Sequence, residues 1–191
     1  MMKNVLILNG NPKRQSLCHT ISDAYQSGVA PAHHVRRFDL GSMTFDPDLS
    51  GGYDSSKTLE TSLQEFQEML LWADHITIVS PIWWGGIPAK LKGLIDRSLL
   101  PGFAFKYESG NPNVIPLLEG KTSQLILTMD APEEYAQVQA DPVLAQLNQF
   151  TLQFCEIECL EPVFLCSASF VDNDKIVDWQ ANVRELASRM V

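Results

Sequence analysis

The chain has 191 residues, of which 45% are hydrophobic and 19% are charged, a composition typical of one globular domain. Its 14 basic and 23 acidic residues give a formal net charge of -9, which argues against a general nucleic-acid binder, because such proteins neutralise phosphates with basic side chains. No apolar run approaches the roughly 18 residues of a membrane span. We therefore expect a single domain over residues 1–191, without a membrane span or a nucleic-acid partner.

The sequence has four cysteines, at Cys18, Cys155, Cys159 and Cys166. They lack Cys-x-x-Cys spacing and have no histidines at metal-ligand spacing, so we expect no metal. The first apolar run, residues 5–8, is too short for a secretory signal peptide. We interpret the cysteines as reduced thiols of a cytoplasmic protein. Cys155 and Cys159, four residues apart, could form a redox pair or pack in the core.

Apolar runs alternate with helical periodicity along the whole chain. Strands are predicted at residues 3–8, 34–40, 76–80, 123–128 and 163–166. Helices are predicted at residues 16–28, 59–70, 88–99, 143–154 and 176–190, with a long loop at 41–56. This alternation predicts a doubly wound parallel α/β sheet. Ligands bind such sheets beyond the carboxyl ends of the strands, which is where function is expected.

The first candidate loop, residues 9–16, leaves a strand and enters a helix. Backbone amides at the helix start, the Ser16 hydroxyl, Lys13 and Arg14 could bind a phosphate. Its glycine, asparagines and proline also suit a plain turn. The loop is neither Gly-x-Gly-x-x-Gly nor a Walker loop, which disfavours a nicotinamide Rossmann site and a P-loop nucleotidase.

The second candidate loop, residues 81–88, carries adjacent tryptophans, Trp83 and Trp84, at the end of a central strand. They indicate a pocket for a planar ring, because Gly85 and Gly86 permit close backbone approach. The alternative is one core and one surface tryptophan.

The third candidate loop, residues 128–135, follows the fourth strand. Asp130, Glu133 and Glu134 could ligate a divalent metal or simply be solvated, and Tyr135 could be a proton donor or a packing residue. A further segment, residues 102–107, alternates aromatic with small or basic residues. It could form the wall of a planar-substrate pocket or a partner interface.

Residues 81–97, PIWWGGIPAKLKGLIDR, followed by GFAFKY at 102–107, resemble the flavodoxin-like NAD(P)H:quinone oxidoreductase family, which includes DT-diaphorase and small bacterial NAD(P)H dehydrogenases. The resemblance covers roughly residues 3–170. It implies a three-layer sandwich around a five-stranded parallel sheet of order 2-1-3-4-5. It also implies tightly bound FMN or FAD, NAD(P)H as co-substrate, and a homodimer with sites at its interface.

The resemblance also implies roles by position. The flavin phosphate end would meet Asn11, Ser16, Leu17 and Cys18. The flavin ring would be lined by Pro81, Ile82, Trp83, Trp84 and Gly85. Its polar edge and ribityl chain would face Thr128, Met129, Asp130 and Ala131, although the family often has two glycines in this loop. Tyr135 would stabilise the reduced flavin as a catalytic residue, and the substrate pocket would contain Trp83, Phe103 and Phe105.

The implied activity is ping-pong hydride transfer, in which NAD(P)H reduces the flavin and a quinone or similar planar acceptor then receives two electrons. The alternatives are an azo or nitroaromatic reductase on the same fold, a flavodoxin-type electron carrier, and a regulatory subunit without turnover of its own.

Overall fold

A parallel sheet forms the centre of the computed structural model, which describes residues 2–54, 57–110 and 113–189. Its strands are β1 (Asn4–Asn9), β2 (His34–Asp39), β3 (His75–Pro81), β6 (Thr122–Thr128), β7 (Glu158–Cys159) and β8 (Val163–Leu165). They run in the order β2-β1-β3-β6, and both β7 and β8 pair with β6. All these pairings are parallel, which confirms the predicted sheet and its order.

The fifth position of the sheet is occupied by two short strands instead of one. The β7 strand pairs with the start of β6 and β8 pairs with its end. Between them the backbone N–H of Leu160 still donates to Ser123 O at 2.9 Å. Pro162 then interrupts the ladder, because proline has no N–H to donate.

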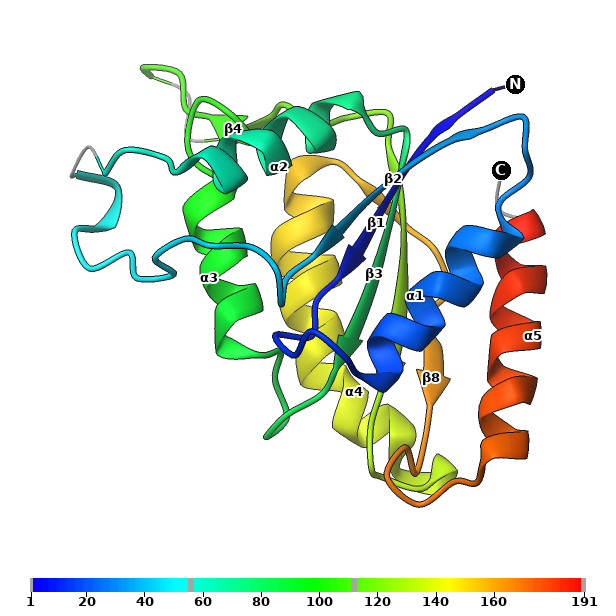
Figure 1. Ribbon diagram of the computed structural model, residues 1–191. Coiled ribbons are helices and arrows are strands. Elements are labelled where there is room, and N and C mark those ends of the chain that lie inside the picture. The colour runs from blue at the N-terminus through cyan, green and yellow to red at the C-terminus, as the bar shows by residue number, and fades with distance from the viewer. Residues whose placement is uncertain (1, 55–56, 111–112, 190–191) are drawn as a thin grey trace.

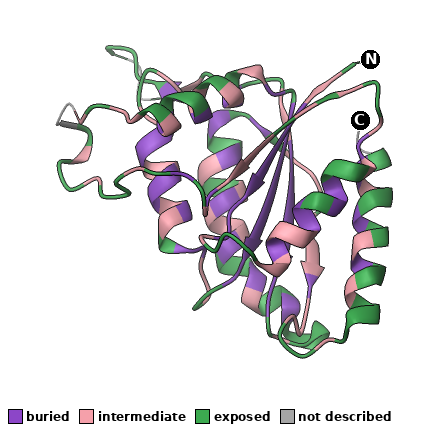
Figure 2. Ribbon diagram, viewed as in Figure 1, coloured by how far each residue is buried: buried purple, intermediate pink, exposed green. Residues whose placement is uncertain are grey.

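Helices cover both faces of the sheet (Figure 1). One face carries α1 (Leu17–Gly28) and α5 (Asn173–Arg189), and the other carries α2 (Thr61–Trp72), α3 (Ala89–Ser98) and α4 (Ala136–Leu144). Every residue of β3 is buried, as expected of a central parallel strand. Figure 2 shows this buried sheet between helices that turn their exposed sides outward. None of the described helices is long and apolar enough to cross a bilayer.

The helix predicted at 143–154 differs from the structure. The α4 helix begins at Ala136, and the chain continues as a π-helix, η3 (Ala145–Leu152), and a 3₁₀ turn, η4 (Gln153–Cys155). Pro142 lies inside α4 and provides no N–H, which disturbs the regular hydrogen-bond ladder. The apolar spacing predicted a helix here but did not predict that residues Ala145–Leu152 form a π-helix.

Shorter elements complete the chain: the 3₁₀ turns η1 (Gly52–Asp54) and η2 (Glu133–Tyr135), and a hairpin of β4 (Phe105–Lys106) and β5 (Ile115–Pro116). The long loop predicted at 41–56 contains η1, and its residues 55 and 56 lie outside the described residues. The last helix starts at Asn173, three residues before the predicted start, and residue 190 of that prediction also lies outside the described part.

Candidate functional site

The carboxyl ends of β1, β3 and β6, together with the loop after β8, enclose a cavity of about 210 Å³ that we call the strand-end cavity. It is lined by Asn11, Lys13, Gln15, Ser16, Leu17, Cys18, Pro81, Ile82, Trp83, Thr128, Met129, Asp130, Ala168 and Ser169. All the predicted cofactor-binding residues except Trp84, Gly85 and Ala131 lie in this lining. The three separate loops therefore converge because parallel strands end at one edge of the sheet.

The start of α1 forms one end of the strand-end cavity. Ser16 is the N-cap residue, and its Oγ accepts a hydrogen bond from His19 N at 3.2 Å. The remaining free N–H groups of the first turn and the helix dipole favour an anion here. Lys13 and Gln15 add a cation and an amide to the same lining. This end of the cavity has the chemistry of a phosphate site.

A chain of polar contacts lies beneath the strand-end cavity. Asn9, which is fully buried, donates from Nδ2 to Asp39 Oδ1 at 2.8 Å and accepts from Asn11 N at 3.2 Å. Asn11 Nδ2 lies 3.7 Å from Cys18 Sγ, which in turn lies 3.6 Å from Thr128 Oγ1. Burial raises the pKa of the Cys18 thiol, so the group stays neutral. These contacts fix the first loop relative to β6.

The two tryptophans of the second loop have different surroundings. Trp83 and Gly86 exchange two backbone hydrogen bonds, of 2.9 and 3.0 Å. The residues between them, Trp84 and Gly85, have φ values of 53° and 69°, as a tight type I′ turn requires. Gly85 therefore serves the turn, while Trp83 lines the cavity and the side chain of Trp84 projects fully into solvent.

The third loop is joined to the loop after β8. Ser167 N donates to Ala131 O at 3.0 Å, and Ala168 N donates to Met129 O at 2.9 Å. Ser169 N donates to the Asp130 carboxylate at 2.8 Å. Three lining residues were not predicted from the sequence: Gln15, Ala168 and Ser169. The last two follow the fifth predicted strand, whose end pointed to this place.

The three acidic residues of the third loop are not grouped as a set of metal ligands in the described structure. Among the described residues, no three His, Cys, Asp or Glu side chains are grouped to hold a metal ion. Tyr135 ends η2, is 61% exposed and does not line the strand-end cavity. Its predicted catalytic role stays a prediction.

The chain is similar to known proteins over most of its length. A family model described as the flavodoxin-like fold matches residues 3–190. Mouse ribosyldihydronicotinamide dehydrogenase [quinone] is 31% identical over 166 residues, which are 78% of this chain and 68% of the mouse protein. The chain belongs to the flavodoxin-like NAD(P)H:quinone oxidoreductase family. The resemblance seen in the sequence is confirmed.

Two further proteins show how far this flavodoxin-like likeness extends. A Haemophilus influenzae protein named as an uncharacterized NAD(P)H oxidoreductase is 35% identical over 128 residues, 64% of this chain and 62% of that protein. The match thus spans less than two thirds of the Haemophilus protein. The solved structure of an NAD(P)H:quinone oxidoreductase from Methanothermobacter marburgensis shares the fold, with a TM-score of 0.82 at 21% identity and complete coverage of both chains.

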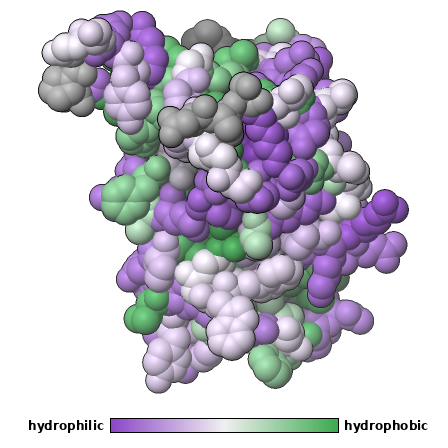
Figure 3. All heavy atoms as spheres, turned by 90° about the vertical axis from the view of Figure 1, so that its left-hand side faces the viewer, coloured by the Kyte–Doolittle hydropathy of each residue, from purple (hydrophilic) through white to green (hydrophobic). Residues whose placement is uncertain are grey.

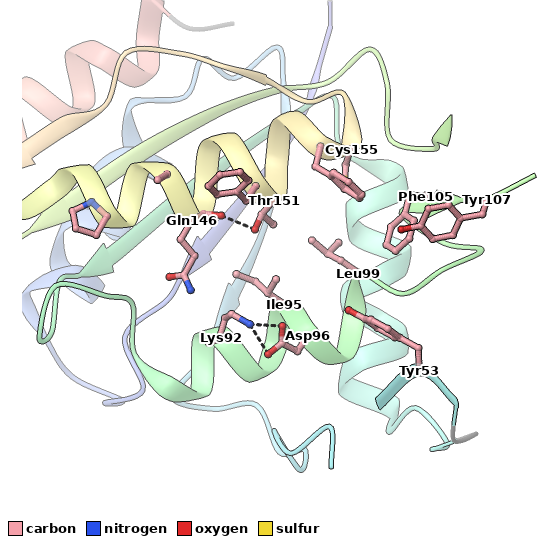
Figure 4. Close-up of a pocket in the computed structure, with 14 residues that line it drawn as sticks. Tyr53, Lys92, Ile95, Asp96, Leu99, Phe105, Tyr107, Gln146, Thr151 and Cys155 are labelled. Carbon is pink, nitrogen blue, oxygen red and sulfur yellow. Dashed lines mark hydrogen bonds and ion pairs between the residues drawn. The ribbon is translucent and has the colours of Figure 1, made fainter. Parts of the chain in front are cut away.

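This flavodoxin-like chain has a second, larger cavity of about 550 Å³, which we call the aromatic cavity (Figure 4). It is lined by Tyr53, Lys92, Ile95, Asp96, Leu99, Phe105, Tyr107, Pro142, Ala145, Gln146, Phe150, Thr151, Phe154 and Cys155. The Phe105 ring packs edge-on against Tyr107 and Phe154, with centroids 5.6 and 5.2 Å apart. Figure 4 shows Tyr53 entering from its loop and the Lys92–Asp96 ion pair along α3.

The predicted substrate pocket is divided in a single chain. Phe105 lines the aromatic cavity, whereas Trp83 lines the strand-end cavity. Phe103 is half-buried against the main core cluster and lines neither. Along the chain, Trp83 comes before the amino end of α3 and Phe105 comes after its carboxyl end, where Figure 1 shows β4.

Exposed apolar side chains surround the aromatic cavity. Figure 3 looks onto the side of the molecule that carries α3 and β4, where apolar patches lie between hydrophilic side chains. The exposed fractions are 61% for Tyr53, 63% for Tyr107 and 68% for Phe150. Clustered exposed aromatic residues are typical of surfaces that bind a ligand or a partner.

Proposed function

We propose that this chain is a flavin-dependent NAD(P)H oxidoreductase that reduces quinones or similar planar acceptors by two-electron hydride transfer. The strand-end cavity carries the proposal, because it joins an anion-binding end at Lys13 and Ser16 to a ring-binding end at Trp83. The relatives described above, a quinone dehydrogenase and an NAD(P)H oxidoreductase, support the same activity.

The side chains of the strand-end cavity fit FMN, or the FMN half of FAD. The α1 start, with Lys13 and the Ser16 hydroxyl, suits the phosphate. The side chains of Asn11 and Thr128 offer hydrogen-bonding atoms for a ribityl chain, and Ile82 and Trp83 offer apolar surface for a ring. When bound, a flavin supplies the two-electron carrier that the side chains lack.

The protein's own groups would orient the rings and exclude water. Trp83 would hold one side of the ring. The backbone of Trp83 is hydrogen-bonded to Gly86 across the tight turn, which limits the movement of this residue. The backbone around Trp83 and the Tyr135 hydroxyl would stabilise negative charge on a reduced ring. Tyr135 is the exposed last residue of the third loop, from which its hydroxyl would reach a bound ring from the solvent side.

A homodimer would complete the site. The strand-end cavity, at about 210 Å³, is smaller than the roughly 300–1,000 Å³ of ordinary ligand pockets, so one chain encloses only part of a flavin. The exposed aromatic cavity of a second copy would provide the missing wall and bring Phe105, with Phe103 two residues before it in the chain, near Trp83 of the first copy. Four free cysteines favour the cytoplasm as the location.

An absorption spectrum tests the cofactor and the reaction. The purified protein is mixed with FMN or FAD, desalted, and titrated with NADH and NADPH under anaerobic conditions. We expect retained flavin absorbance that a nicotinamide bleaches and a quinone restores. A chain that retains neither flavin contradicts the proposal. Retained flavin that no nicotinamide reduces favours an electron carrier or a regulatory subunit, and faster turnover with an azo dye than with any quinone favours an azoreductase.

Sedimentation velocity tests the homodimer. We expect a dimer, and Phe150→Ser, which removes an exposed apolar ring from the aromatic cavity, should shift the population toward the monomer. Val177→Ser is the matched control, because Val177 is also exposed but lies on α5 on the opposite face. A monomeric wild-type protein contradicts the dimer.

A further inference from the structure

The strand-end cavity carries opposite charges on the loops that follow two different strands. Lys13 is the basic side chain in its described lining, and Asp130 is the acidic one. Lys13 follows β1 and Asp130 follows β6, and β3 lies between these two strands. An elongated ligand with one anionic end must therefore place that end toward Lys13, away from the Asp130 carboxylate.

The Asp130 carboxylate is held in place by the neighbouring loop. Its Oδ1 accepts the backbone N–H of Ser169 at 2.8 Å. Two backbone hydrogen bonds fix the same pair of loops, from Ser167 N to Ala131 O at 3.0 Å and from Ala168 N to Met129 O at 2.9 Å. Met129, the residue before Asp130, is buried. Asp130 itself is exposed, and the hydrogen bond from Ser169 N fixes the position of its carboxylate in the cavity lining.

We propose that Asp130 lowers the reduction potential of the flavin held in the strand-end cavity. This inference rests on the proposed function, since it concerns the same ligand. With a phosphate bound beside Lys13, the ring would extend toward the end of β6 and Asp130. A fixed negative charge beside a ring opposes the gain of electrons and leaves the uncharged oxidised ring nearly unaffected. A bound ring also displaces water from the carboxylate, which reduces screening of its charge.

A lower flavin potential affects the reduction of the flavin and the reduction of the acceptor in opposite directions. A lower potential makes the reduced flavin a stronger reductant toward its acceptor and reduces the driving force for its own reduction by a nicotinamide. Asp130 is therefore a residue that tunes which acceptors can be reduced. It need not donate or accept a proton to do so.

Asp130→Asn is the decisive variant, because its amide oxygen can still accept the Ser169 N–H while the charge is removed. The midpoint potential of the bound flavin is measured at pH 7 by equilibration with a reference dye. We expect the equilibrium constant for two-electron reduction to rise at least tenfold, which is about 30 mV for such a couple. The dissociation constant of the oxidised flavin should change less than threefold.

Glu134→Gln is the matched control, since it removes the same charge from an exposed residue four positions away that lines neither cavity. Its potential should stay at the wild-type value. Asp130→Ala separates charge from loop position, because it removes the acceptor for Ser169 as well. An upward shift in both Asp130 variants, but not in Glu134→Gln, supports the inference.

Three results overturn the inference. One is an unchanged potential in Asp130→Asn with flavin bound, and another is an equal shift in Glu134→Gln, which would assign the effect to net charge. The third is a shift in Asp130→Ala alone, which would assign it to the position of the loop. None of these results affects the proposed function. A wild-type chain that retains no flavin contradicts the proposed function itself and removes the basis of the inference.

Discussion

The phenol oxygen of Tyr25 lies 3.2 Å from Nε2 of His75, a histidine with no exposed surface. His75 Nδ1 lies 2.7 Å from Thr122 Oγ1, so the ring joins α1 to two central strands. These contacts lie at the amino ends of the strands, away from both cavities. Burial, with a contribution from Lys3, lowers the pKa of His75 to about 4. Burial also raises the pKa of Tyr25 to about 12.

We expect His75 to make stability fall in mild acid. Its pKa is about 4 in the folded chain and near 6.5 when unfolded, so between these values the unfolded chain binds more protons. Its contribution is therefore fully present above about pH 6.5 and is lost as the pH falls toward 4, by about 3 kcal/mol. Urea unfolding across pH 4–7 measures the loss.

His75→Gln should flatten this part of the stability profile, whatever its effect at pH 7. His34→Gln is the control, because His34 is exposed at the start of β2. Equal pH profiles for the wild type and His75→Gln would contradict the assignment.

Ser16→Ala should weaken both the helix and the anion site. The substitution removes the oxygen that accepts the His19 N–H, at a cost of about 1 kcal/mol in the free energy of unfolding. Flavin affinity should fall at least tenfold if Ser16 also meets the phosphate. Urea unfolding and a flavin titration give the two values. Ser16→Asn preserves the cap and should restore stability more fully than affinity, so a full rescue of both would show that the hydroxyl itself is not a ligand.

Arg97 should be the most costly charged residue to replace in α3. Its guanidinium is 1% exposed, lies 2.8 Å from Glu60 Oε2, and donates to the carbonyls of Asp46 and Thr58. Arg97→Met leaves these acceptors without their donor, which should lower the free energy of unfolding by about 3 kcal/mol.

Lys92→Met is the control for Arg97, because Lys92 forms a partly exposed ion pair with Asp96 on the same helix. Such pairs contribute only about 0.5 kcal/mol. Similar losses in the two variants, measured by urea unfolding, would contradict the structural role of the buried guanidinium.

Gly28→Ala should separate α1 from α5. A Cβ at this position would lie 2.4 Å from Arg184 O and 2.6 Å from Arg184 Cα, and backbone atoms cannot move aside locally. Overpacking of this kind costs about 1–3 kcal/mol. Gly86→Ala, whose Cβ would have its nearest contact at 3.8 Å from Trp83 O, should be nearly neutral in thermal unfolding. An unchanged melting temperature for Gly28→Ala would show that the two helices are not in close contact.

The amino-acid sequence by itself determined the layer architecture and most of the long elements. The β3 strand contains the apolar residues Ile76, Ile78 and Val79 and no acidic residue, lysine or arginine, as suits a buried strand. The apolar positions of α2 repeat at helical spacing, because one face of that helix is buried. It also determined that residues 11, 16–18, 81–83 and 128–130 follow strands or start helices. Since parallel strands end at one edge, their convergence on one cavity could be expected from topology alone.

Only the tertiary structure decided which of these side chains share a cavity. Asp130 meets Ser169, 39 residues away, through loops whose approach depends on how β8 pairs with β6. Phe105 and Trp83 line different cavities, although the sequence placed both in one substrate pocket. Local periodicity records which face of an element is buried, but it carries no distance between elements. Those distances arise from the packing of helices against the sheet, where each contact depends on many others.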